Sequence, residues 1–416
     1  MAEIFFFFTW SLSIITVLLK KRYFDLFTLA IVIGTYYASP LFFGTLYDPT
    51  LRIIVDIIDR LYWFYGLFFL FLYVAMTYSD FKRIRPIDDF PNTRESNSLI
   101  LFSLLPVFLF FTLIFLDPNF FIPSEIGESN PSEFGPIYPL FIWSTMILLV
   151  FALKFRNKKF LLASLFLVLA TLLAGSRAVF ATSILLSVMI TAWNIGRMRI
   201  LFHPRYIIGG IFCFLFLFFY KIGYGALIQM DLQLVMNNIT DIAIISSRFF
   251  QGGESFLVML NLQNTFIYMD MESVFLSDAL IRDHYHQVFM IKLIPLLSEY
   301  YAEIFNISLY RFSDLLHDKF YPDVFYGLAS TFWGEAIYVL GIGFAGAIVI
   351  LMIFVLFLYL GNKLIFSNNI VANSLTPVLV YCSFYLGRKE IADVVYILTI
   401  SLFILILNEI LVRVFR

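Results

Sequence analysis

The sequence predicts an all-α integral membrane protein, with about eleven membrane-spanning helices and one large extracytoplasmic loop. Hydrophobic residues make up 61% of the 416 residues and charged residues only 14%, whereas a soluble domain carries about 25% charged residues. Long apolar runs alternate with short polar segments, and clusters of basic residues recur between them. A chain so poor in charge exposes most of its surface to lipid, and the alternation indicates repeated crossings of the membrane.

Eleven apolar segments approach or reach the length needed to cross a hydrocarbon core of about 30 Å. They lie near residues 4–19, 23–44, 61–78, 98–116, 137–153, 160–173, 178–193, 206–222, 333–360, 368–386 and 391–411. The sequence therefore predicts three parts, which are about eight helices in residues 1–222, the large loop in 223–330, and about three helices in 331–416.

The basic clusters predict which side of the membrane each polar segment faces. The first apolar run precedes the cluster KKR at residues 20–22, whereas a secretory signal carries its positive charges first. This cluster and those within 81–85, 154–159 and 196–199 fall on one side of the predicted membrane, which collects 17 of the 28 Lys and Arg residues. Because positive residues concentrate in cytoplasmic loops, the N-terminus is expected outside and the C-terminus in the cytoplasm.

Three segments are then expected on the outer side. Residues 45–60 include LRIIVDIIDR, whose Ile and Val spacing predicts a helix lying at the membrane interface. Residues 117–136 hold four of the 14 prolines and predict an irregular turn. Residues 223–330 form a loop long enough to fold by itself, and unstructured loops of that length without a function are uncommon. The functional site is therefore expected in this loop or where it meets the membrane.

An arginine interrupts the apolar segment LLAGSRAVFATSILL at residues 172–186. Residues 160–173, which precede it, would span only about 21 Å as a helix, so Arg177 is expected at a turn slightly below the outer surface. One interpretation is that its side chain extends to lipid phosphates. The other is that it is a fixed cation at the floor of an outward-facing cavity, where its planar guanidinium would bind a phosphate-bearing headgroup.

Two further segments place charged residues on the outer side. SSRFFQGGESF at residues 246–256 brings Arg248, Gln251 and Glu254 close together around two glycines, which permit a close backbone approach. GRKEIAD places Arg388 and Lys389 at the outer end of the tenth predicted span. Ordinary ion pairs on a loop explain either segment alone.

The three arginines Arg177, Arg248 and Arg388 are expected at a similar depth on the outer side. If they converge, they form an anion-binding site at membrane level, where ionisable residues are by default functional.

The remaining motifs are weaker. GIGFAG at 341–346 matches a dinucleotide fingerprint in spelling but lies inside an apolar run without a βαβ unit, so its glycines are expected to allow close helix packing. His284 and His286 alternate in the loop without a second ligand cluster, so no metal is expected. His286 is a candidate general base. Glu335, at the start of the ninth span, is a candidate to bind substrate and accept a hydroxyl proton, or marks the interface.

Four segments together resemble a known family. GSRAVFATSILL after a short span, SRFFQGGESF in the large loop, STFWGEAIYVLGIGFAG opening the next span, and GRKE ending the one after it are similar to segments of the Wzy-type O-antigen or oligosaccharide repeat-unit polymerases. The likeness follows the order of the spans along most of the chain. It implies a GT-C-like membrane glycosyltransferase in the bacterial inner membrane, active on the periplasmic face.

The resemblance also implies a reaction and a set of roles. Repeat units on undecaprenyl pyrophosphate would be transferred onto a lipid-linked acceptor in surface polysaccharide synthesis, without cofactor or metal and with a chain-length regulator protein as a further partner. The family's important periplasmic arginines match Arg177, Arg248 and Arg388. With Glu254 or His286 as base, the arginines would stabilise the departing pyrophosphate. Lys389, Gln251 and Glu335 complete the predicted substrate site. No nucleic acid partner is expected.

Three alternatives remain. An O-antigen ligase-like enzyme would share the chemistry and differ in its acceptor. A lipid-linked oligosaccharide flippase would carry charged residues inside its spans around a central cavity, whereas here the span interiors are nearly free of charge and the polar complexity concentrates in one outer loop. A scaffolding membrane protein would have no use for the outer arginines.

Overall fold

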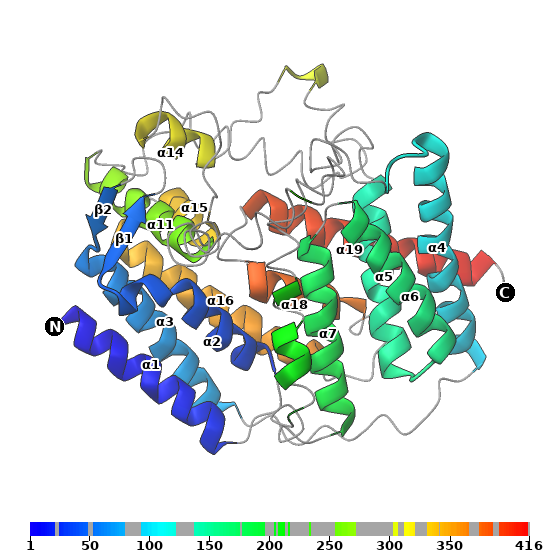
Figure 1. The fold of residues 1–416 in the computed structure, drawn as a ribbon, viewed down its shortest axis with the longest axis horizontal. Helices are drawn as coiled ribbons and strands as arrows, with labels where there is room; N and C mark the ends of the chain where they lie inside the picture. The colour runs from blue at the N-terminus through cyan, green and yellow to red at the C-terminus, as the bar shows by residue number, and fades with distance from the viewer. Residues whose placement is uncertain are drawn as a thin grey trace. The chain divides into compact units, whose positions relative to one another are not determined.

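The structure is a computed structural model whose described part consists almost wholly of helices (Figure 1). It describes residues 1–20, 25–48, 53–79, 93–121, 137–174, 177–195, 204, 207–212, 215–216, 233, 254–271, 303–306, 312–320, 331–340, 342–365, 374–385 and 391–414, some of them, including Arg177 and Glu254, by their backbone alone.

The chain divides into two compact units, each made of separate stretches of sequence. The first comprises Met1–Phe81, Ser246–Asn362 and Cys382–Tyr396, and the second Lys82–Ile245, Lys363–Tyr381 and Ile397–Arg416. The described elements of the first unit are α1 (Ala2–Leu19), α2 (Leu26–Tyr37), the 3₁₀ helix η1 (Ser39–Phe42), β1 (Thr45–Asp48), β2 (Ile53–Asp56), α3 (Asp59–Tyr78), α11 (Glu254–Met271), α14 (Phe312–Phe320), α15 (Phe332–Leu340) and most of α16 (Phe344–Ile365).

Helices α1 and α3 form a closely packed parallel pair in the first unit. A Cβ added at Gly66 of α3 would collide with the ring of Phe5, so the glycine lets the two helices approach closely. Farther along, the Ser13 hydroxyl donates to the Phe69 carbonyl oxygen at 2.8 Å. At the far end, the Lys20 ammonium donates to the carbonyl oxygens of the last turn of α3. Both helices therefore run in the same direction, from an acidic start to a basic end.

Two strands, Thr45–Asp48 and Ile53–Asp56, form a β-hairpin where an interfacial helix was predicted. Strands β1 and β2 pair antiparallel, with Leu46 opposite Val55 and Tyr47 opposite Ile54. Leu46 is buried whereas Ile54 is 72% exposed, so the burial alternates with the two-residue period of a strand. The Ile and Val residues of this segment fit either period, and their β-branched side chains favour the strand. Gly44, at a φ of +73°, leads into β1 in a conformation that suits glycine.

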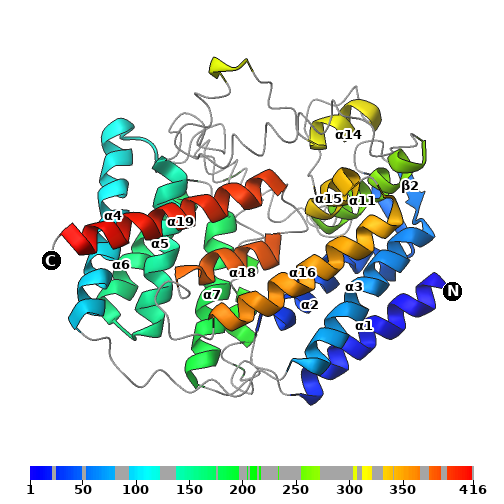
Figure 2. The ribbon, with the colours of Figure 1, turned by 180° about the vertical axis from the view of Figure 1, so that it is seen from behind.

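The predicted span at 333–360 is also corrected, because two helices occupy this region. Helix α15 ends at Leu340 and α16 begins at Phe344, and Gly343 lies between them at a φ of +60°. Gly343 thus shapes a turn rather than a helix contact, while Gly341 lies outside the described residues. Helix α15 folds back beside α16, since the rings of Trp333 and Phe354 are 4.9 Å apart. The ring of Phe354 in α16 also stacks on that of Phe68 in α3, with 6.0 Å between the ring centroids, and both helices can be followed in Figure 2.

The second unit packs around α5 (Ile137–Lys154). Its neighbours include α4 (Thr93–Leu116), α6 (Lys158–Leu173) and α7 (Arg177–Ile195), and parts of α18 (Thr376–Tyr385) and α19 (Ile391–Val414) belong to the same unit. Most of α5 is buried. The Asn157 side chain caps the start of α6 by accepting from the backbone N–H of Lys159 and Phe160. A tight turn therefore connects α5 to α6 as neighbouring antiparallel helices.

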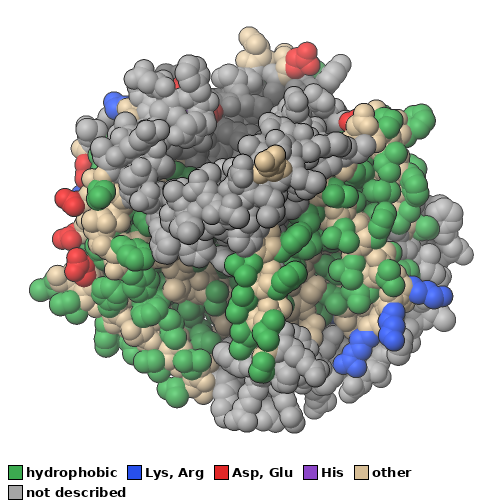
Figure 3. Space-filling view, viewed as in Figure 1, with side chains coloured by type: hydrophobic (Ala, Val, Ile, Leu, Met, Phe, Trp, Pro, Cys, Tyr) green, Lys and Arg blue, Asp and Glu red, His purple; other side chains and the backbone are tan. Residues whose placement is uncertain are grey.

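Four helices of the described part are long and apolar enough to cross a membrane. They are α1, α3, α5 and α16. Shorter apolar helical stretches occur at Leu26–Tyr37, Leu104–Leu116, Ala178–Ala192 and Asp393–Leu407. Large apolar side chains remain exposed on these helices, for example Phe115 at 87% and Ile4 at 74%, and Figure 3 shows apolar side chains over much of the described surface. The protein is therefore a helical membrane protein, and eleven spans remain a prediction.

Candidate functional site

Of the predicted site residues, only Glu335 has a described side chain. Arg177 begins α7 in the second unit and Glu254 begins α11 in the first, each described by its backbone alone. The other predicted site residues, which lie outside the described part, are Arg248, Gln251, His286, Arg388 and Lys389. The convergence of the three arginines stays a prediction, and Glu335 is the predicted site residue whose surroundings the structure describes.

Glu335 lies in the first turn of α15, where Thr331 organises the start of the helix. The backbone N–H of Gly334 donates to the Thr331 hydroxyl at 2.9 Å, and the N–H of Glu335 donates to the Thr331 carbonyl oxygen at 3.0 Å. This is the capping arrangement expected of a threonine before a helix. The Glu335 side chain is only 2% exposed, and a negative charge there is favoured by the helix dipole.

The start of α15 lies beside the middle of two helices that can span the membrane. Trp333 contacts Phe68, near the middle of α3, at 5.9 Å between ring centroids. Its ring also packs edge-on against Phe354, near the middle of α16. Glu335, two residues further along, therefore lies within the apolar part of the first unit rather than on its polar end. Ionisable groups in such surroundings are rare, and by default they are candidates for a functional site.

Helix α11 covers α15 and is held on one side by the β-hairpin and α3. The Gln263 amide donates to the Asp56 carbonyl oxygen at 3.0 Å and accepts from the Ile58 N–H at 3.3 Å. Two turns later, Asp270 pairs with Arg60 at the start of α3, with both carboxylate oxygens 2.6 Å from the same guanidinium nitrogen. These contacts hold α11 against the end of β2 and the start of α3.

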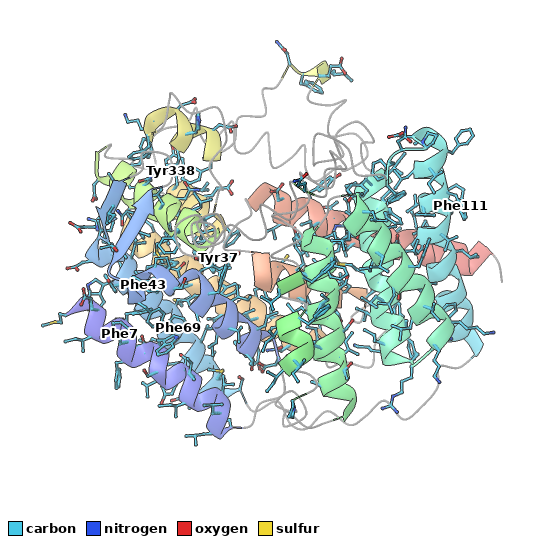
Figure 4. All side chains as sticks on the ribbon, in the orientation of Figure 1. Phe7, Tyr37, Phe43, Phe69, Phe111 and Tyr338 are labelled. Atoms are coloured by element: carbon cyan, nitrogen blue, oxygen red, sulfur yellow. The ribbon has the colours of Figure 1, made fainter. Side chains whose placement is uncertain are left out.

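The opposite face of α11 contacts α15. A Cβ added at Gly334 would lie 2.7 Å from the Thr265 hydroxyl oxygen and 2.8 Å from that of Thr331. Both hydroxyl oxygens therefore lie close to the α-carbon of Gly334. Three residues after Thr265, the ring of Tyr268 is 5.9 Å from that of Tyr338. Figure 4 labels Tyr338 where α11, α14 and α15 gather. Glycine at position 334 therefore permits the close contact between the two helices.

One side chain on this face lacks hydrogen-bond partners. Asn261 lies one turn before Thr265, is 1% exposed, and has neither its amide nitrogen nor its amide oxygen hydrogen-bonded. The backbone carbonyl oxygen of Asn261 accepts from the Thr265 hydroxyl at 2.9 Å. We refer to Asn261, Thr265, Thr331, Gly334 and Glu335 as the α11–α15 seam.

The sequence reading predicted Glu335 and missed the other members of the seam. Helix α11 is not among the described helices that are long and apolar enough to cross a membrane, and the sequence predicts residues 223–330 only as a large loop that could fold by itself. A signal was present, because NLQNT at residues 261–265 interrupts the otherwise apolar stretch SFLVMLNLQNTFIYM. Position 254 precedes position 261 by seven residues, which is two helical turns, so Glu254 belongs to the same helical face as Asn261.

Within the described residues, no group of three or more His, Cys, Asp or Glu side chains is placed to hold a metal ion. Comparison with known proteins finds no matching family model, no matching curated protein and no matching solved structure.

Proposed function

We propose that the protein is a membrane glycosyltransferase that polymerises lipid-linked oligosaccharide repeat units. In this proposal it takes the growing glycan from an undecaprenyl pyrophosphate carrier and transfers it onto a second lipid-linked unit. The reaction takes place at the periplasmic face of the bacterial inner membrane. The observation that carries the proposal is the buried carboxylate of Glu335 inside an apolar helical unit, because an ionisable group at that depth is expected to be functional.

The packing of two motif segments also supports the proposal. SRFFQGGESF and STFWGEAIYVL are far apart in the sequence and are two of the four segments that resemble the polymerase family. The first ends in the first turn of α11 and the second contains the start of α15, and α11 and α15 pack against each other where Gly334 approaches Thr265, nine residues after the first segment ends. The helices that carry these two segments are therefore neighbours, as helices that contribute to one site are expected to be.

The proposed reaction exchanges a glycosyl–pyrophosphate bond for a glycosidic bond. A hydroxyl oxygen of the acceptor sugar attacks the anomeric carbon of the donor glycan, the bond from that carbon to the pyrophosphate oxygen breaks, and the pyrophosphate leaves on its lipid carrier. Arg177 and Arg248, with Arg388 and Lys389, are assigned to the pyrophosphate, whose growing negative charge they would stabilise. The hydroxyl proton passes to a carboxylate or imidazole base.

Glu335 is assigned to the acceptor hydroxyl, and Glu335→Gln tests this assignment. The substitution keeps the size of the side chain and its place in the first turn of α15 but removes the carboxylate. In cells that lack the native gene, we expect the variant to insert normally and to yield acceptors carrying a single repeat unit, seen as loss of the long-chain ladder on a glycan gel. Loss of a proton acceptor typically lowers the rate by about 10²–10⁴-fold.

The matched control is Glu303→Gln, because Glu303 lies in an exposed turn of the same unit and should leave the ladder intact. Arg177→Ala and Arg248→Ala should reproduce the single-repeat product. A normal ladder from Glu335→Gln would remove Glu335 from the site, and a normal ladder from all three variants would refute the proposed site. A ligase would instead control whether glycans of any length reach their final acceptor.

A further inference from the structure

We infer that Asn261 binds a hydroxyl group of the acceptor sugar within the α11–α15 seam. The inference rests on the proposed function and adds a substrate contact to it. It starts from an unusual side chain, since Asn261 is 1% exposed and both polar atoms of its amide lack a hydrogen-bond partner. Leaving a buried polar group without a partner is costly, and groups of this kind in native structures call for an explanation.

Other buried polar atoms in the described part also lack partners, but they differ in kind. Each of the others belongs to a side chain with one such atom, such as the Tyr65 hydroxyl or the Asn362 amide nitrogen. The second polar atom of Asn362 is used, because its amide oxygen accepts from the Leu26 N–H at 2.9 Å. Asn261 combines an unpaired donor with an unpaired acceptor, so a ligand that satisfies it must both accept and donate a hydrogen bond.

A hydroxyl group is the ligand that can use both ends of this amide. It can donate to the Asn261 oxygen, and its own oxygen, or that of a neighbouring hydroxyl on the same ring, can accept from the Asn261 nitrogen. A metal cation would use only the amide oxygen, and a phosphate only the amide nitrogen. Sugars present adjacent hydroxyls on one ring, so a sugar suits the Asn261 amide better than either ion.

The neighbours of Asn261 agree with a hydroxyl ligand. The Thr265 hydroxyl already donates its hydrogen to the Asn261 carbonyl oxygen, and the Thr331 hydroxyl already accepts from the Gly334 N–H. Thr265 therefore retains acceptor capacity and Thr331 a free hydrogen. Glu335 follows Gly334, the residue that both hydroxyls approach. A hydroxyl bound here would lie on the part of the seam that also carries the proposed proton acceptor.

The test compares Asn261→Leu with Gln263→Leu, both in α11. Asn261→Leu replaces an unpaired amide by an apolar group of similar size, so the thermal stability should stay the same or rise. We expect it to raise the KM for the lipid-linked acceptor at least tenfold, with the KM for the donor unchanged. Gln263→Leu removes the hydrogen bonds to Asp56 and Ile58. It should therefore lower the melting temperature and leave the acceptor KM unchanged.

A binding measurement separates this inference from the polymerase assignment. The probe is the undecaprenyl pyrophosphate-linked oligosaccharide extracted from cells lacking the gene, added to the purified protein in nanodiscs. The probe can occupy the donor site as well as the acceptor site, so the wild type should gain thermal stability from it, and Asn261→Leu should lose only the part of this gain that comes from the acceptor site. Polymerisation with an unchanged acceptor KM in Asn261→Leu would overturn the inference alone, since Asn261 would then make no contribution to acceptor binding. Stabilisation that depends on Asn261 without polymerisation would overturn the polymerase assignment alone.

Discussion

At the residue scale, the hydroxyl side chains of the first unit show how polar groups are accommodated in an apolar surrounding. Ser13, fully buried in α1, donates to the Phe69 carbonyl oxygen of α3. Thr35 donates to the Ile31 carbonyl oxygen of its own helix and accepts from the Trp10 ring nitrogen at 3.1 Å. Because lipid offers no hydrogen bonds, such groups use backbone carbonyls and neighbouring helices. Asn261 departs from this pattern.

The contact at Gly334 leads to a stability prediction. The methyl group of Gly334→Ala would lie 2.7 Å from the Thr265 hydroxyl oxygen and 2.8 Å from that of Thr331. Both hydroxyls are fixed by hydrogen bonds to backbone atoms, so neither can move away from the added methyl group without losing its hydrogen bond. We expect a loss of about 1–3 kcal/mol in the free energy of unfolding, the usual cost of overpacking, measured by thermal or denaturant unfolding in detergent micelles.

The matched control is Gly346→Ala in the first turn of α16. There the nearest atom to an added Cβ is 3.4 Å away, so this substitution should be neutral or slightly stabilising. The double variant Gly334→Ala with Thr265→Ala should recover part of the lost stability, since residues in contact show coupled effects. An unchanged melting temperature in Gly334→Ala alone would contradict the close packing of α11 on α15.

At the element scale, the predictions from sequence succeeded where an apolar run was long and uninterrupted. The segments 4–19, 61–78 and 137–153 are confirmed as helices long and apolar enough to cross a membrane, because a helix is the form in which a single segment satisfies its backbone in lipid. Predictions failed where the pattern fits two structures. The Ile and Val residues of 53–58 suit a strand as well as a helix, and the run 333–360 conceals a turn at Gly343.

The site was predictable only in part for a related reason. Glu335 was found because a carboxylate at the start of an apolar run is conspicuous in the sequence. The rest of the seam depends on contacts between α11 and α15, which are far apart in the chain. Asn261 acquires its significance from the absence of a hydrogen-bond partner, which no sequence pattern encodes. The grouping of Arg177, Arg248 and Arg388 was likewise inferred from segment order alone.

One element contact can be tested through the end of α3. The Lys20 ammonium donates to the carbonyl oxygens of Met76 at 3.1 Å and Thr77 at 2.8 Å, so α1 supplies a positive charge to the negative end of the α3 dipole. Lys20 is exposed, and we therefore expect Lys20→Met to lower the free energy of unfolding by only about 0.3–1 kcal/mol. Thermal unfolding at several salt concentrations measures this loss.

Lys20→Arg is the control for this contact, because it keeps the charge and its donors. It should retain most of the stability, and the difference between the two variants should shrink as salt screens the interaction. Equal loss in both variants at every salt concentration would show that the geometry of the ammonium, rather than its charge, holds the end of α3.

At the scale of the whole molecule, the orientation expected from the basic clusters stays a prediction, and the charges of the first unit are arranged in a way that is compatible with it. Helices α1 and α3 are parallel, with Glu3 and Asp59 in their first turns and Lys20 where both end. Parallel neighbours require a returning segment between them, which α2 supplies although its 12 residues are few for a full crossing. If the basic end faces the cytoplasm, as positive residues usually do, the acidic end and the N-terminus face outward.

Labelling of single cysteines tests this orientation across α5 in the second unit. The chain has two cysteines, Cys213 and Cys382, and both are first replaced by serine. Asn119→Cys lies in the exposed turn after α4, and Lys158→Cys in the exposed start of α6. Because α5 lies between them and is long enough to cross, a membrane-impermeant maleimide should label Asn119→Cys in intact spheroplasts and Lys158→Cys only after permeabilisation. The reverse pattern would show the opposite orientation, and labelling of both in intact spheroplasts would show that α5 does not cross. Either result would contradict the prediction that Arg177 lies near the periplasmic face, and with it the proposed site.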